Sequence, residues 1–221
     1  MTTDQTLHRK RFDPSTQATP DEYEAQGSLV LPGYTWKQYL SLDQLFHGSG
    51  VRVRFLEHHL EIMPPISESH ETKKVHVSRL MEVHVSRLME AWCLDRDIEL
   101  FGRGSTTLKI PEEAGGEPDE SYCIGRAKNR PDLVIEIALT SGGLSKRAFY
   151  AKFQVPELWI WRNQQLKVHV FDEKSGSYEE APESSQLPGI DLKAIETCAN
   201  LPSINQAVRD FRKLTSQDPE A

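Results

Sequence analysis

Glu136 is the residue whose position most strongly indicates chemistry. It lies inside the apolar run DLVIEIAL over 132–139. An isolated ionised carboxylate in such a strand would be costly to bury unless it is paired or bound to a metal. Two interpretations therefore stay open for Glu136. It is either a strand-end glutamate that pairs with an arginine, or a ligand of a hard cation.

The second interpretation needs another carboxylate and a cation nearby. Asp119 opens the strand that precedes Glu136, and a turn over 125–130 could pair the two strands. Carboxylates with backbone carbonyls and water form an oxygen site of the type that Mg²⁺ or Mn²⁺ prefers, and Ile137 is the neighbouring residue predicted to ligate. Lys146 begins the helix after the strand and could reach back over the metal. This set favours a metal-assisted hydrolysis in which the metal activates a water molecule and the lysine balances the charge of the attacking hydroxide.

The elements that must position these residues can be read from hydrophobic periodicity and turn signals. In VRVRFLEHH, Val53 and Phe55 alternate with Arg52 and Arg54, the pattern of a half-buried strand. The predicted order is a helix over 35–46, a hairpin over 51–63, a long helix from about 71 to 93, strand material over 98–110, a loop over 112–119, a strand over 119–125, a buried strand over 132–139, a helix over 144–153, a hairpin over 157–172 and a helix over 202–214. This order predicts an α/β fold with a mixed β-sheet flanked by helices.

The long predicted helix contains a tandem duplication. The octapeptide VHVSRLME occupies residues 75–82 and again residues 83–90. Eight residues turn a helix by about 80° beyond two full turns, which could break a buried stripe. The apolar stripe nevertheless continues through Val77, Met81, Val85, Leu88 and Trp92. One continuous helix is therefore predicted, and the alternative is that one copy loops out.

Composition limits the possible classes of protein. The chain has 221 residues, and its net charge of −7 argues against binding nucleic acid by bulk charge alone. No apolar run is long enough for a membrane span, and no signal peptide is expected. Three cysteines without paired spacing fit a reducing cytosol, so we expect a cytoplasmic protein. We predict a flexible arm over 1–30, one domain over 31–200, and a short helix with a polar tail over 201–221.

Several runs of the chain together resemble a known family. These runs are LEIMPPISESHE, GSTTLK, EPDESYCIG, RPDLVIEIALTS, LSKRAFYAKFQVPELWIWR and LKVHVF. Over roughly residues 30–195 they are similar to the Uma-type putative restriction endonuclease family, within the PD-(D/E)xK nuclease superfamily. The resemblance implies a restriction-endonuclease-like core, dependence on a divalent metal, and DNA as the substrate.

Individual residues of this chain match the functional positions of the family pattern. Asp119 matches the aspartate of the family's PD motif, Glu136 its strand carboxylate, and Lys146 its lysine on the following helix. Glu71 matches an acidic position that can face the metal. The resemblance thus implies Asp119, Glu136 and Lys146 as catalytic residues, and Glu71 as a further metal ligand.

Two positions depart from the family pattern, and the duplication lies near a third. Ala138 and Ser145 stand where close relatives often carry acids, and the repeat over 75–90 lies in the helix that carries Glu71. The leading hypothesis is a metal-dependent endonuclease. The alternatives are a catalytically silent module that binds DNA or protein, and a hydrolase that acts on RNA or a nucleotide. The resemblance also implies a homodimer, for which the apolar hairpin over 157–171 could supply the interface.

Overall fold

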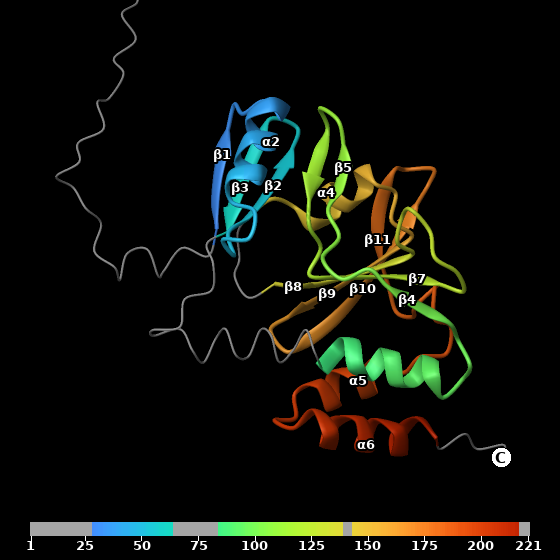
Figure 1. The fold of residues 1–221 in the computed structure, drawn as a ribbon. Helices are drawn as coiled ribbons and strands as arrows, with labels where there is room; N and C mark the ends of the chain where they lie inside the picture. Colours follow the sequence, from blue (N-terminus) through green and yellow to red (C-terminus); the bar gives the residue numbers. More distant parts are fainter. Residues whose placement is uncertain (1–27, 64–83, 139–142, 217–221) are drawn as a thin grey trace, which may run out of the picture.

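The computed structural model describes residues 28–63, 84–138 and 143–216, which form two β-sheets and five helices (Figure 1). The strands are β1 (Leu29–Pro32), β2 (Arg52–Leu56), β3 (His59–Met63), β4 (Leu100–Gly102), β5 (Leu108–Ile110), β6 (Ala114–Gly116), β7 (Glu120–Ile124), β8 (Leu133–Ile137), β9 (Glu157–Arg162), β10 (Gln165–Asp172) and β11 (Ser177–Ala181). The helices are α2 (Trp36–Leu45), a helix over 84–94, α4 (Lys146–Lys152), α5 (Leu192–Ala199) and α6 (Ile204–Thr215).

The strands divide into two sheets. The first has five strands in the order β1-β3-β2-β6-β5, and all of its pairs are antiparallel. The second has six strands in the order β11-β10-β9-β8-β7-β4, in which β8 and β9 form a parallel pair. The prediction of an α/β fold with a mixed sheet flanked by helices is confirmed. The division into two sheets, with β1, β11 and α5 as additional elements, was not predicted.

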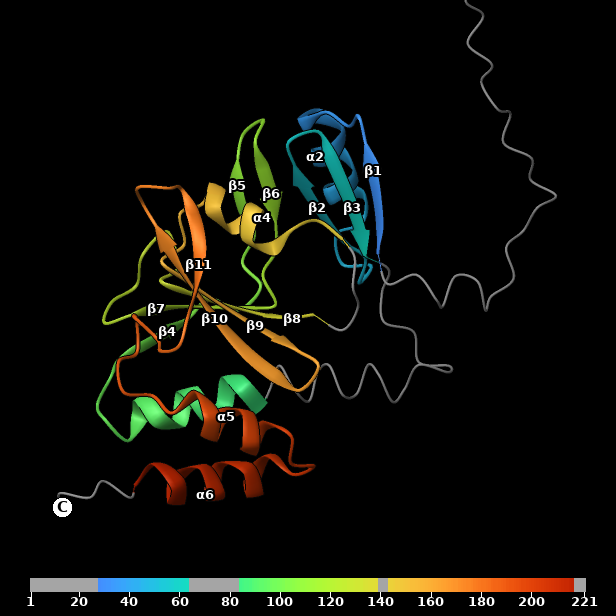
Figure 2. The ribbon, with the colours of Figure 1, turned by 180° about the vertical axis from the view of Figure 1, so that it is seen from behind.

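The elements are arranged in layers. In Figures 1 and 2, the helix over 84–94, α5 and α6 cover one side of the six-stranded sheet, and α4 lies on its other side with the five-stranded sheet beyond. Separate apolar clusters fill the space on the two sides of the six-stranded sheet. A third cluster joins α2 to the outer face of β2 and β3. The space between the sheets is therefore interior, although it also holds charged side chains.

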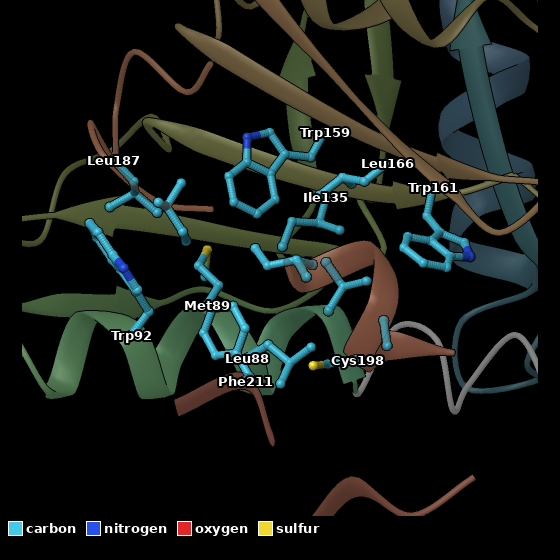
Figure 3. Close-up of a cluster of buried hydrophobic side chains, with 14 of the residues drawn as sticks. Leu88, Met89, Trp92, Ile135, Trp159, Trp161, Leu166, Leu187, Cys198 and Phe211 are labelled. Carbon is cyan, nitrogen blue, oxygen red and sulfur yellow. The ribbon is translucent and has the colours of Figure 1, made fainter. Parts of the chain in front are cut away.

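The largest core lies under the helices (Figure 3). It packs Ile135, Trp159 and Trp161 from the sheet against Leu88 and Met89 of the helix over 84–94. Phe211 of α6 and Cys198 of α5 close the same cluster. The C-terminal helices are therefore part of the main core.

The described part of the duplicated segment is helical. Val85, Leu88 and Trp92, which belong to the predicted apolar stripe, are all buried. Residues 84–90 of the second octapeptide therefore form a helix that presents its apolar face to the sheet. The rest of the predicted long helix, over 71–83, lies outside the described residues.

The predicted loop over 112–119 is wrong in its centre, because β6 pairs there with β2 and β5. Its glycines were read as a loop signal, but they serve close packing. A Cβ added to Gly115 would lie 2.5 Å from Cε1 of Tyr39, and one added to Gly116 would lie 3.0 Å from Cγ of Arg54. The strand thus contains glycines because large side chains press on both of its faces.

The predicted hairpin over 157–172 is confirmed as β9 and β10, but it does not supply a free interface. Both strands lie inside the six-stranded sheet, with neighbours on each edge. Trp159, Trp161 and Leu166 are buried within the chain's own core. The apolar character of this hairpin is therefore explained by the fold of the single chain.

Two leucines of the helix over 84–94 provide a matched test of this packing. Leu88 is fully buried, whereas Leu94 is 70% exposed. We expect Leu88→Ala to lower the free energy of unfolding by about 2–5 kcal/mol, and Leu94→Ala to change it by less than about 0.5 kcal/mol. Urea denaturation of both variants measures the difference. Equal losses would show that the duplicated helix does not pack as described.

Candidate active site

Glu136 extends from β8 into the space between the two sheets. Side chains alternate along this fully buried strand, so that Leu133, Ile135 and Ile137 join the core under the helices. Val134 joins the cluster on the α4 side, and Glu136 shares that direction. The carboxylate is therefore buried, with no exposed surface, and it faces α4 and the five-stranded sheet.

Asp119 lies directly before β7, the strand that pairs with β8 on the side away from β9. In the antiparallel register of β7 and β8, Glu120 is opposite Ile135. Extension of this register by one residue places Asp119 opposite Glu136, on the same face of the sheet. The Asp119 Oδ2 atom accepts a hydrogen bond of 2.8 Å from the Ile137 backbone N–H. Because the N–H and C=O of one strand residue point to the same edge, the Ile137 carbonyl also faces Asp119.

Lys146 approaches Glu136 from the start of α4. The helix is capped by Ser145, whose Oγ accepts a hydrogen bond of 3.3 Å from the backbone N–H of Ala148. Ser145, one of the departures from the family pattern, thus forms the N-cap of the helix that carries the lysine. The Lys146 Nζ atom lies 2.6 Å from Glu136 Oε2. One helical turn later, the Tyr150 hydroxyl donates a hydrogen bond to Glu136 Oε1.

Two arginines of β2 complete the cluster. Pairing of Glu136 with an arginine was one of the two open interpretations, but the sequence did not identify Arg54 as the partner. Arg54 Nη2 donates hydrogen bonds to Glu136 Oε1 at 2.8 Å and to the Glu117 carbonyl at 3.1 Å. Arg52, two residues earlier on the same face, pairs with Asp119. The alternation in β2 was correct, but its polar face was assigned to solvent. That face is covered by the six-stranded sheet, and Arg54 is fully buried.

Arg54 is held from several directions. Its guanidinium carbon lies 4.7 Å from the centre of the Phe149 ring, within the range of a cation–π interaction. Glu61 is opposite Arg54 in the pairing of β2 and β3, and Arg54 Nη1 lies 3.7 Å from Glu61 Oε2. Glu61 is also buried. Arg54 therefore links Glu136 of the six-stranded sheet to Glu61 of the five-stranded sheet.

These contacts keep Glu136 ionised. Burial alone would raise its pKa, but the charges of Arg54 and Lys146 and the hydrogen bonds from Lys146 and Tyr150 lower the pKa from 4.5 to about 2. Burial alone would likewise lower the pKa of Arg54, and Glu136 is the main cause of the net rise. The pKa of the Tyr150 phenol is raised, mainly by burial and to a smaller extent by the negative charge of Glu136. At neutral pH the cluster therefore holds a carboxylate, a guanidinium and a protonated phenol.

The donor set fits a hard divalent cation. Two carboxylates on one face of the sheet and a neighbouring backbone carbonyl are oxygen ligands of the kind that Mg²⁺ and Mn²⁺ prefer. Asp119, Glu136 and Ile137 would supply these oxygens. Arg54 and Lys146 already balance Glu136, so their charges would compete with a bound cation. Within 28–63, 84–138 and 143–216, no three His, Cys, Asp or Glu side chains gather into a ready metal site.

The remaining predicted residues lie elsewhere or outside the described ranges. Glu71 falls outside them. Asp132, which like Asp119 follows a proline, accepts hydrogen bonds from the Ile124 N–H at 2.8 Å and from Lys128 Nζ at 2.6 Å. It therefore stabilises the turn before β8. This turn is at the opposite end of β8 from Glu136, so its basic residues, Arg126, Lys128 and Arg130, lie away from the acid pair.

Comparison with known proteins identifies the class of the chain. The family model described as Uma2, putative restriction endonuclease, matches residues 36–199. The chain therefore belongs to the Uma2 putative restriction endonuclease family, within the PD-(D/E)xK-like superfamily. Enzymes of this class generally use divalent metals. A search of curated proteins found no match to the chain.

None of the helices in the described ranges combines the length and the apolar character that crossing a bilayer requires.

Acid titration tests the charge state of Glu136. A carboxyl whose pKa is lowered in the folded state stabilises the protein above its unfolded pKa, and this stability is lost as pH falls through the folded pKa. Between pH 4.5 and pH 2, wild-type protein should lose about 3 kcal/mol through Glu136. Glu136→Gln lacks this titration, so its free energy of unfolding should fall less over that window.

Urea denaturation at a series of pH values measures this effect. Glu183→Gln, at an exposed position, controls for the loss of one acidic group. If wild type and Glu136→Gln lose stability in parallel below pH 4.5, the carboxylate is not held ionised as described.

Proposed function

We propose that the protein is a metal-dependent endonuclease that hydrolyses phosphodiester bonds in DNA. The observation that carries the proposal is the placement of Asp119 and Glu136 opposite one another on one sheet face, with Lys146 Nζ 2.6 Å from Glu136. Membership of a restriction endonuclease family supports the same reaction and DNA as the substrate. Asp119, Glu136 and the Ile137 carbonyl are the proposed metal ligands, and Glu71 is a further proposed ligand outside the described residues.

The residues of the chain have distinct tasks in this proposal. A bound Mg²⁺ or Mn²⁺ would lower the pKa of a water molecule and screen the charge of the phosphate. The carboxylates of Asp119 and Glu136 would hold this cation. Lys146 presents an ammonium group on the same side and stabilises negative charge on the scissile phosphate. Tyr150 donates to one oxygen of Glu136 and so fixes the orientation of the carboxylate.

The second candidate is a catalytically silent member of the family that binds DNA or a protein. A specific observation favours it, because Glu136 and Asp119 are already neutralised by Arg54, Lys146 and Arg52. A buried arginine against the strand acid can satisfy the charge that a cation would otherwise balance. The two candidates therefore differ in whether a divalent ion displaces these contacts.

Plasmid nicking tests the enzyme. We expect Asp119→Asn, Glu136→Gln and Lys146→Ala to reduce Mg²⁺- or Mn²⁺-dependent nicking by at least about 100-fold, since each removes a ligand or a stabilising charge. Asp132→Asn is the matched control, because Asp132 also follows a proline and is equally buried, with both acids 9% exposed. It should retain activity if its fold is intact by circular dichroism. Undiminished nicking by Asp119→Asn would remove the assignment.

Calorimetry with Mn²⁺ separates the two candidates. The enzyme should bind the cation, and Asp119→Asn should abolish the binding. Lys146→Ala should bind Mn²⁺ more tightly than wild type although it loses nicking, because an ammonium group 2.6 Å from a ligand oxygen opposes the cation. Folded wild-type protein that binds neither Mn²⁺ nor Mg²⁺ and does not nick DNA would establish the silent module.

Two further expectations accompany the proposal. The cytoplasm remains the predicted compartment, and the cysteines are consistent with it because Cys93, Cys123 and Cys198 are buried and unpaired within the described residues. A homodimer remains a prediction from the family, without the hairpin of β9 and β10 as its interface.

A further inference from the structure

A basic groove lies at the end of α4 that is remote from Lys146. It has a volume of about 570 Å³ and is lined by β5, the turn before β8 and the last turn of α4. None of the described residues that line it is acidic, although the whole chain has a net charge of −7. Its cationic side chains are Arg103, Lys109, Arg130 and Lys152.

The four cations are not equivalent. Lys109 pairs with Asp43 and Lys152 pairs with Glu57, so that acids outside the groove offset both lysines. Among the described residues, Arg103 and Arg130 have no ion pair. Within the described residues, the two guanidinium groups donate hydrogen bonds only to neutral carbonyl and amide oxygens. The net positive charge of the groove therefore comes from the two arginines.

Both arginines are oriented by backbone groups. Arg103 Nη1 donates to the carbonyl of Lys128, and Arg130 Nη1 donates to the carbonyl of Phe153 at 3.3 Å. A guanidinium has five N–H donors in a planar fork. One or two bonds to carbonyls thus fix its direction and leave other donors for a ligand. A guanidinium fork matches the oxygens of a phosphate group better than the ammonium group of a lysine does.

The position of the groove suits a polymeric ligand. The acid pair lies at one end of the β7–β8 hairpin, and the groove lies at the other end. Asp119 and Ile124, which mark these two ends on β7, are five residues apart. At about 3.4 Å per residue this separation is roughly 17 Å. Double-stranded DNA rises about 3.4 Å per base pair, so one duplex could reach both places about five base pairs apart.

We propose that Arg103 and Arg130 bind the phosphodiester backbone of DNA at a site separate from the scissile phosphate. This inference rests on the proposed function for its choice of ligand. The groove would hold the flank of the duplex while the acid pair acts on the bond that is cleaved. Because phosphate contacts carry no base information, the groove would position DNA without selecting its sequence.

The test measures binding apart from cleavage. A fluorescent 20-bp duplex is titrated with full-length protein in EDTA at several salt concentrations, and anisotropy gives the affinity. The double variant Arg103→Gln/Arg130→Gln should reduce the slope of log affinity against log salt by about 2, since each phosphate contact contributes about 0.9. Arg126→Gln is the matched control, because Arg126 is an exposed arginine of the same turn that does not line the groove.

The outcomes separate this inference from the proposed function. Glu136→Gln should lose nicking but keep the wild-type salt slope, which locates binding away from the acid pair. A double variant with the slope and affinity of Arg126→Gln would overturn the groove proposal, whatever its nicking activity. Wild-type protein without salt-dependent binding would overturn it as well. Nicking that survives Glu136→Gln, together with the expected loss of slope in the double variant, would overturn the acid assignment alone.

Discussion

The central constraint on this fold is one ionised carboxylate buried between two sheets. Glu136 has no exposed surface, and burial without compensation would neutralise it. Arg54, Lys146 and Tyr150 reverse that tendency from two different elements, β2 and α4. The two sheets and the helix must therefore meet at this point for the acid to remain charged, and Gly116 of β6 leaves room for the aliphatic part of the Arg54 side chain.

The same contacts connect stability with chemistry. Breaking a buried ion pair by removing one partner is far more costly than the net stability that the pair contributes. Loss of either Arg54 or Glu136 would therefore leave the other as a buried charge without its main partner. They also define a competition, because a cation that used Glu136 as a ligand would meet Arg54 and Lys146 at the same oxygens. A nuclease and a silent relative can share this architecture. They would differ only in whether a metal cation or the side chains of Arg54 and Lys146 bind the Glu136 carboxylate.

Much of the site was predictable because an acid in an apolar strand is a strong signal. The run around Glu136 identified a buried strand, and the turn after β7 brought Asp119 into register with it. Lys146 followed from the family pattern. Arg54 and Glu61 were not predicted, because alternation in β2 and β3 shows two faces but not which of them a second sheet covers. Likewise, Gly115 and Gly116 indicated a loop, since the side chains that need the space are distant in sequence.

The amino-acid sequence by itself determined the periodicity of each element and the pairing of neighbouring strands. It also determined local helix starts such as that of α2, where the Thr35 hydroxyl accepts a hydrogen bond from the Gln38 N–H. These features depend on local dihedral preferences and short turns, which nearby residues encode. Tertiary structure alone decided that the strands form two sheets, that the arginines of β2 face the acids of β8, and that α4 has acids at one end and a basic groove at the other. Burial and charge pairing at these places arise between segments far apart in the chain, so no local pattern contains them.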